Sequence, residues 1–136
     1  TYAIEFNGYW LDANNADIPA KSGVYCVYAC IYELQDNKVA LQKIIYVGES
    51  EDVRARISNH EKQNDWESKL KYGERLCYSF ASLPSESRER CEAALIFKYK
   101  PPVNTEYVDS FPYDMTTLIV SGKTDMMLNL FTVYHA

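Results

Sequence analysis

Residues 23–32 read Gly-Val-Tyr-Cys-Val-Tyr-Ala-Cys-Ile-Tyr, and residues 44–48 read Ile-Ile-Tyr-Val-Gly. β-Branched and aromatic residues dominate both stretches, which predicts two strands. The polar residues 33–42 separate them and predict a long hairpin loop. We therefore expect Tyr25 and Tyr46 to lie in neighbouring antiparallel strands.

Three helices are predicted after this hairpin. Ser50 and the two acidic residues that follow it favour a helix N-terminus, from which about three turns of helix run. Residues 61–73 predict a second, short helix. Residues 84–100 predict a longer one that ends there, because Pro101 and Pro102 cannot continue it.

Two further strands complete the prediction. Residues 75–81 alternate apolar and polar side chains, and residues 116–121 are rich in β-branched residues. The order of elements favours an α+β fold, with a small antiparallel sheet of about three central strands flanked by helices. We expect residues 1–20 and 105–136 to add accessory strands or to cover an edge of the sheet. A chain of 136 residues fits one domain, residues 1–136.

Composition excludes several classes of protein. Apolar residues make up 47% and charged residues 24% of the chain, which excludes a disordered tail and a coiled-coil rod. No stretch approaches the roughly 20 consecutive apolar residues that span a bilayer, and the first ten residues lack a signal-peptide pattern. The four cysteines match neither a zinc site nor a disulfide framework, so we expect buried, reduced thiols. These features favour a cytoplasmic protein without membrane association.

The distribution of charge leaves two interpretations open. A net charge of −5 argues against a nucleic-acid partner, because phosphate affinity comes largely from Lys and Arg. Residues 54–100, however, hold ten basic residues against seven acidic ones. They either form a modest basic face or are solvated charges that alternate in sign on helices.

Several polar side chains are predicted to lie against the sheet. Arg56 and His60 are four residues apart, so on a helix they share a face. Glu92 lies beside the apolar stripe of the long helix, which is an unusual place for a carboxylate. None is specific alone, since strand tyrosines usually pack in cores and single helix histidines usually form ordinary hydrogen bonds. The set is Tyr25, Tyr46, Arg56, His60, Glu92 and Asn104.

In this order and spacing the set resembles the GIY-YIG nuclease family over residues 21–104. The two name-giving tripeptides are present as Gly23-Val24-Tyr25 and Tyr46-Val47-Gly48, with valine in place of isoleucine. Arg56 follows ten residues after the second tyrosine, and His60 four residues later, as in homing endonucleases of the family. The twelve-residue step from Glu92 to Asn104 is similar to that in the excision-repair nuclease UvrC.

The resemblance implies a metal-dependent endonuclease that nicks DNA or cuts both strands, in DNA repair or in a mobile element. Glu92 would hold one Mg²⁺ or Mn²⁺. Tyr25 would act as general base or position the attacking water, with help from His60 or a nearby cation, since tyrosine has an ordinary pKa near 10. Arg56 would bind a phosphate oxygen, and Tyr46 would bind water or phosphate.

Asn104 would orient the segment near the glutamate from its loop, again by resemblance to the family. Two other hypotheses stay open. The acidic flanks and the lack of a separate DNA-binding domain favour a nucleic-acid-binding domain that cleaves poorly alone and needs a partner protein for specificity. Alternatively, the motif is coincidental in a small α+β domain. Glu49 and Glu89 add negative charge near the predicted site and would either assist metal binding or repel phosphate.

Overall fold

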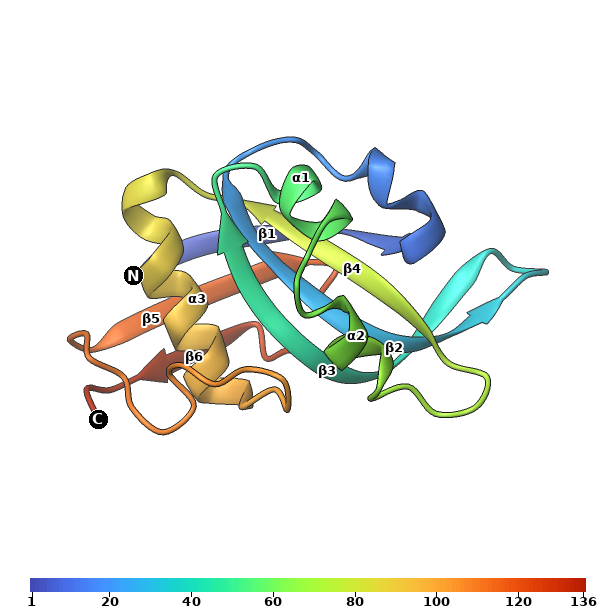
Figure 1. Cartoon of the computed structure of the whole chain (residues 1–136). Coiled ribbons are helices and arrows are strands. Elements are labelled where there is room, and N and C mark those ends of the chain that lie inside the picture. The colour runs from blue at the N-terminus through green and yellow to red at the C-terminus, as the bar shows by residue number, and fades with distance from the viewer.

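The computed structural model describes all residues, 1–136, and gives an α+β fold with ten short elements (Figure 1). In chain order the elements are β1 (Tyr2–Leu11), the 3₁₀ helix η1 (Asp12–Asp17), β2 (Gly23–Glu33), β3 (Lys38–Ser50), α1 (Val53–Ser58), α2 (Gln63–Glu67), β4 (Arg75–Ser82), α3 (Ser85–Tyr99), β5 (Thr116–Gly122) and β6 (Leu130–Val133). None of the helices combines the length and the apolar character needed to cross a bilayer.

All six strands form one mixed sheet in the order β3-β2-β4-β1-β5-β6. The three strands predicted around residues 23–32, 44–47 and 75–81 are β2, β3 and β4, and they are adjacent and antiparallel. The sheet has six strands and not about three, because the flanking residues 1–20 and 105–136, which were expected to add accessory strands or to cover an edge, contribute β1, β5 and β6. β1 extends the sheet antiparallel to β4, β5 pairs parallel with β1, and β6 pairs antiparallel with β5 as the second edge strand. The pairings of β1 with β4 and with β5 join segments far apart in sequence, which local periodicity does not encode.

The β2–β3 hairpin is longer than expected. β3 begins at Lys38, and its first residues pair with the end of β2, as in Cys30↔Leu41 and Glu33↔Lys38. The predicted loop over residues 33–42 is therefore wrong, and only residues 34–37 connect the two strands. The tip of the hairpin is solvated on both faces, so its strands carry no apolar alternation that would reveal them.

Helices cover the two faces of this sheet unequally. α3 packs on one face, in a core that includes Phe6, Tyr28 and Leu95. η1, α1 and α2 cover the other face, around Trp66 and Tyr78. Figure 1 shows α3 on one side of β3 and α1 and α2 on the other. The four cysteines are buried and free, as predicted. β3 is an edge strand and lies at the junction of the two layers.

α1 and α2 are shorter than expected, whereas α3 matches the helix predicted over residues 84–100. α1 begins after Asp52, whose side chain accepts a hydrogen bond from the Ala55 amide at 3.1 Å, and it ends at Ser58 instead of running for three turns. Asn59 leaves the helical region (φ −145°, ψ 57°), so His60 does not share a helix face with Arg56. α2 covers five residues of the predicted 61–73, because Trp66 alone anchors it in the core.

Candidate active site

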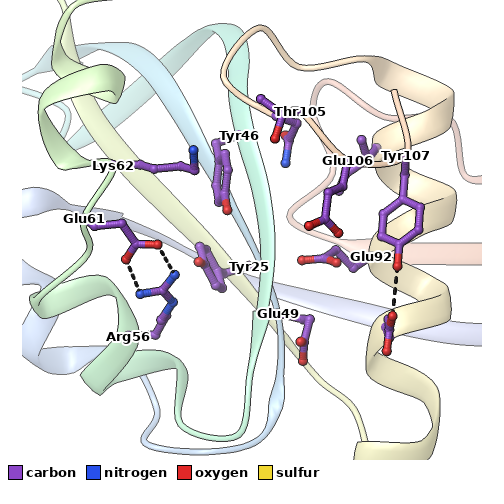
Figure 2. Close-up of a pocket in the computed structure, with 13 residues that line it drawn as sticks. Tyr25, Tyr46, Glu49, Arg56, Glu61, Lys62, Glu92, Thr105, Glu106 and Tyr107 are labelled. Atoms are coloured by element: carbon purple, nitrogen blue, oxygen red, sulfur yellow. Dashed lines mark hydrogen bonds and ion pairs between the residues drawn. The ribbon is translucent and has the colours of Figure 1, made fainter. Parts of the chain in front are cut away.

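A cleft of about 420 Å³ lies over the edge strand β3, between α1 and the segment after it on one side and α3 on the other (Figure 2). It contains five of the six side chains predicted from sequence, and His60 lies behind it against Tyr25. The lining residues are Tyr25, Tyr46, Glu49, Arg56, Glu61, Lys62, Glu89, Glu92, Ile96, Asn104, Thr105, Glu106 and Tyr107.

Gly48 lets Tyr25 reach this cleft from the second strand of the sheet. The two residues are direct partners in the β2–β3 register. A Cβ atom on Gly48 would lie 2.3 Å from both Cζ and the hydroxyl oxygen of Tyr25, far inside van der Waals contact. The phenol therefore crosses β3 only where that strand has no side chain. Gly23 has a similar constraint, since its Cβ would lie 2.1 Å from the Ala81 carbonyl oxygen.

His60 holds the Tyr25 hydroxyl from behind. Its Nε2 lies 2.9 Å from the Tyr25 oxygen, and its Nδ1 accepts a hydrogen bond from the Lys62 amide at 3.0 Å. Because Nδ1 is an acceptor, the neutral ring carries its proton on Nε2 and donates it to Tyr25. Burial, followed by the charge of Arg56, lowers the pKa of His60 to about 4, which favours this neutral form. His60 therefore acts as a hydrogen-bond donor to the tyrosine.

Tyr25 and Tyr46, two of the three tyrosines that line the cleft, are neutral near pH 7. Burial is the main cause that raises the pKa of Tyr25 well above its usual value near 10. Burial, with the carboxylate of Glu92, also raises the pKa of Tyr46 to about 12. Since the Tyr25 oxygen accepts from His60, its own hydroxyl hydrogen is free to donate into the cleft. This geometry suits the positioning of a water molecule or an anionic oxygen.

Arg56 points into the cleft from α1 and is held there by Glu61. The two terminal nitrogens of the guanidinium donate to the two carboxylate oxygens, at 2.6 and 2.8 Å. This bidentate contact lowers the pKa of Glu61 to about 2. The Nε edge of Arg56 takes no part in it, so this edge remains available to a phosphate. Glu61 was not predicted, because an exposed glutamate in a polar segment carries no periodic signal.

Glu92 projects from α3 on the opposite wall of the cleft (Figure 2). Burial and the nearby carboxylates of Glu49, Glu106 and Glu89 together raise the pKa of Glu92 to about 8. Glu49 is bound by Arg88 at 2.7 Å, and Glu89 accepts a hydrogen bond from the Tyr107 hydroxyl at 2.8 Å. Glu92 itself forms no ion pair.

The oxygen donors around Glu92 fit a hard divalent cation that keeps most of its water ligands. No group of three or more His, Cys, Asp or Glu side chains is arranged to hold a metal ion. A site made entirely of protein ligands, such as a structural zinc site, therefore does not fit. Mg²⁺ commonly uses one or two carboxylates and several waters. A cation beside Glu92 would also relieve the repulsion among the carboxylates that raises its pKa.

Asn104 attaches the loop that follows α3 to the edge of β3. Its side-chain oxygen accepts from the Val47 amide and its side-chain nitrogen donates to the Val47 carbonyl, both at 2.9 Å. The adjacent Val103 amide donates to the Ile45 carbonyl at 3.2 Å. The side chain thus pairs with β3 as a neighbouring strand would. It places Thr105, Glu106 and Tyr107 along the cleft, and it bonds to the strand and not to Glu92.

Residues 24–107 match the family model described as the GIY-YIG catalytic domain, which covers more than half of the chain. The chain belongs to the GIY-YIG family. It is also 32% identical over 99 residues to the UvrABC system protein C of Fervidobacterium nodosum. That match includes 71% of this chain and only 16% of the relative's length. No solved structure matches.

Proposed function

We propose that this GIY-YIG domain is a metal-dependent endonuclease that hydrolyses DNA phosphodiester bonds, by nicking or by cutting both strands. The observation that carries the proposal is the arrangement of three groups in one cleft. The neutral Tyr25 hydroxyl lies at its centre, the Arg56 guanidinium on one wall, and the unpaired Glu92 carboxylate on the other. Hydrolysis of a phosphodiester needs an oriented water, a bound phosphate oxygen and neutralised charge, and each group fits one of these tasks.

Glu92 is the residue that would hold the metal, and the carboxylate of Glu106 faces the same part of the cleft. Mg²⁺ or Mn²⁺ bound there would stabilise the negative charge that develops on the phosphate and on the leaving oxygen. Because the metal binds the carboxylate form, occupation of the site would displace the proton that burial favours on Glu92. The wall that carries Glu92 and Glu106 would then bear less net negative charge and would repel a phosphate less.

Tyr25 would orient the attacking water through its free hydroxyl hydrogen. The hydrogen bond from His60 fixes the direction of that hydroxyl, and it would stabilise the phenolate if Tyr25 gives up its proton during the reaction. Arg56 would bind a non-bridging phosphate oxygen through its Nε edge while Glu61 holds the opposite edge. Tyr46 lies beside Tyr25, with 6.3 Å between ring centroids, and would bind the same water or the phosphate.

A second candidate function is a DNA-binding domain that needs a partner protein for cleavage or specificity. The charge of the cleft favours the need for a partner. Five carboxylates and only two cations line the cavity, and this excess of negative charge repels the phosphates of DNA. The match also covers only 16% of the length of the UvrC relative. The activity, substrates and partners of that whole protein are therefore not assigned to this chain.

Cleavage of supercoiled plasmid by purified wild type, Glu92→Gln and Glu86→Gln tests the proposal. Glu86 is a matched control, since it lies exposed in the first turn of α3 and outside the cleft. Each protein is assayed with Mg²⁺, with Mn²⁺ and with chelator. We expect wild type and Glu86→Gln to nick or linearise the plasmid only with metal, and Glu92→Gln to lose at least about a hundredfold in rate.

Equal activity of Glu92→Gln, or activity in chelator, would contradict the assignment of Glu92. If wild type binds DNA but does not cut it under any condition, the partner-dependent function takes its place.

A further inference from the structure

The cations of the cleft are not equally available to a phosphate. Arg56 and Lys62 are the two cationic residues that line it. Glu61 neutralises Arg56 through both terminal nitrogens, whereas the ammonium of Lys62 takes part in no ion pair. Lys62 is therefore the one unpaired positive charge in a cavity lined by five carboxylates.

Hydrogen bonds to His60 and Trp66 hold the main chain of Lys62 in place. Its amide donates to His60 Nδ1 at 3.0 Å, and its carbonyl accepts from the Trp66 amide at 2.9 Å at the start of α2. Trp66 is fully buried and packs against His60 in a tilted arrangement, with 4.4 Å between ring centroids. The base of the lysine side chain is thus fixed to the same group that holds Tyr25.

The side chain of Lys62 extends from this anchored base toward Tyr46 (Figure 2). It lies on the wall formed by Arg56 and Glu61, facing the carboxylates of α3. An anion bound in the cleft beside the tyrosines therefore lies in a cavity that the Lys62 side chain also lines. A lysine in such a place acts as a flexible point charge that can follow a phosphate group.

We propose that Lys62 is a second phosphate-binding catalytic residue, which contacts a non-bridging oxygen of the scissile or adjacent DNA phosphate beside Arg56. This inference rests on the proposed nuclease function and adds a residue to its site. Arg56 supplies a directional donor edge and Lys62 supplies the unpaired charge. Lys62 compensates for the charge that Arg56 shares with Glu61.

Two measurements on Lys62→Met, Lys62→Arg and the control Lys123→Met test this role. Lys123 is exposed between β5 and β6 and does not line the catalytic cleft. The first measurement is the single-turnover cleavage rate with Mg²⁺. The second is the salt dependence of binding to a short DNA duplex, in chelator and with each variant carried in the Glu92→Gln background so that no cleavage occurs. Thermal melting of each variant checks its fold.

We expect Lys62→Met to lower the cleavage rate about tenfold or more, and to reduce the slope of log K against log salt by about one. Lys62→Arg should restore the slope, and Lys123→Met should match wild type in both measurements. Wild-type rates and slopes in folded Lys62→Met would overturn the role of Lys62 while leaving the nuclease function intact. A wild-type protein that neither binds nor cuts DNA would overturn the proposed function itself.

Discussion

Acidification should destabilise this protein through one buried histidine. The side chain of His60 is 0% exposed, and it uses Nε2 to donate to Tyr25 and Nδ1 to accept from the Lys62 amide. Protonation of Nδ1 would remove that acceptor and place a charge between aromatic rings and near Arg56. The folded state therefore favours the neutral ring.

The size of the effect follows from the difference between two pKa values. Burial and Arg56 lower the pKa of His60 to about 4 in the folded protein, from 6.5 when the chain is unfolded. Below pH 6.5 the unfolded chain binds a proton that the folded protein does not, so the free energy of unfolding falls as the pH falls. Linkage gives a loss of about 2 kcal/mol at pH 5 and about 3 kcal/mol at pH 4, where it nears its limit.

Urea denaturation between pH 7 and pH 4 measures this loss. Other groups also titrate in this range, so the informative quantity is the difference between wild type and His60→Gln, whose amide stays neutral. His135→Gln is the matched control, because His135 is exposed near the end of the chain. We expect wild type and His135→Gln to lose about 3 kcal/mol more than His60→Gln by pH 4. Parallel pH profiles for all three proteins would refute the assignment of a buried neutral imidazole.

Three further substitutions test the packing and charge of the cleft. Gly48→Ala should cost about 1 to 3 kcal/mol in denaturant unfolding and abolish plasmid cleavage, because its methyl group occupies the path of the Tyr25 phenol. Asn104→Ala should cost about 1 to 3 kcal/mol, since it leaves both polar groups of Val47 without partners; an unchanged urea midpoint would contradict this. Glu61→Gln should tighten DNA binding by up to about fivefold in chelator, because it removes the carboxylate that neutralises Arg56. Weaker binding in fluorescence anisotropy would show instead that Glu61 mainly orients Arg56.

The centre of the fold could be predicted from sequence because its elements carry local signals. β2 is rich in β-branched and aromatic residues and its first eight residues are buried, and α3 ends where Pro101 and Pro102 forbid its continuation. In the outer half of the sheet a strand could be predicted, since residues 116–121 correspond to β5, but the pairing of these strands could not. β1 pairs parallel with β5 across more than a hundred residues of sequence, and nothing in either segment specifies that partner.

The candidate site likewise has a part that could be predicted from sequence and a part that could not. The motif was sufficient to predict that Tyr25, Tyr46 and Glu92 lie close together, and all three line one cleft. Each of them lies in a regular strand or helix, whose position the sequence pattern indicates. The details around them depend on irregular backbone. The end of α1 at Ser58 turns His60 inward behind Tyr25, although a longer helix would have placed it beside Arg56.

The position of the cleft on an edge strand explains why the fold and the site depend on each other. A free edge usually carries unpaired amides and carbonyls that invite aggregation. Here the side chain of Asn104 pairs with Val47, so the loop from α3 covers part of that edge and forms one wall of the cleft. An edge strand is also the only place where Tyr25, one strand inward, can reach solvent by crossing a single glycine, Gly48. Each wall belongs to a different face of the sheet, so both hydrophobic cores must form before Arg56 and Glu92 face each other.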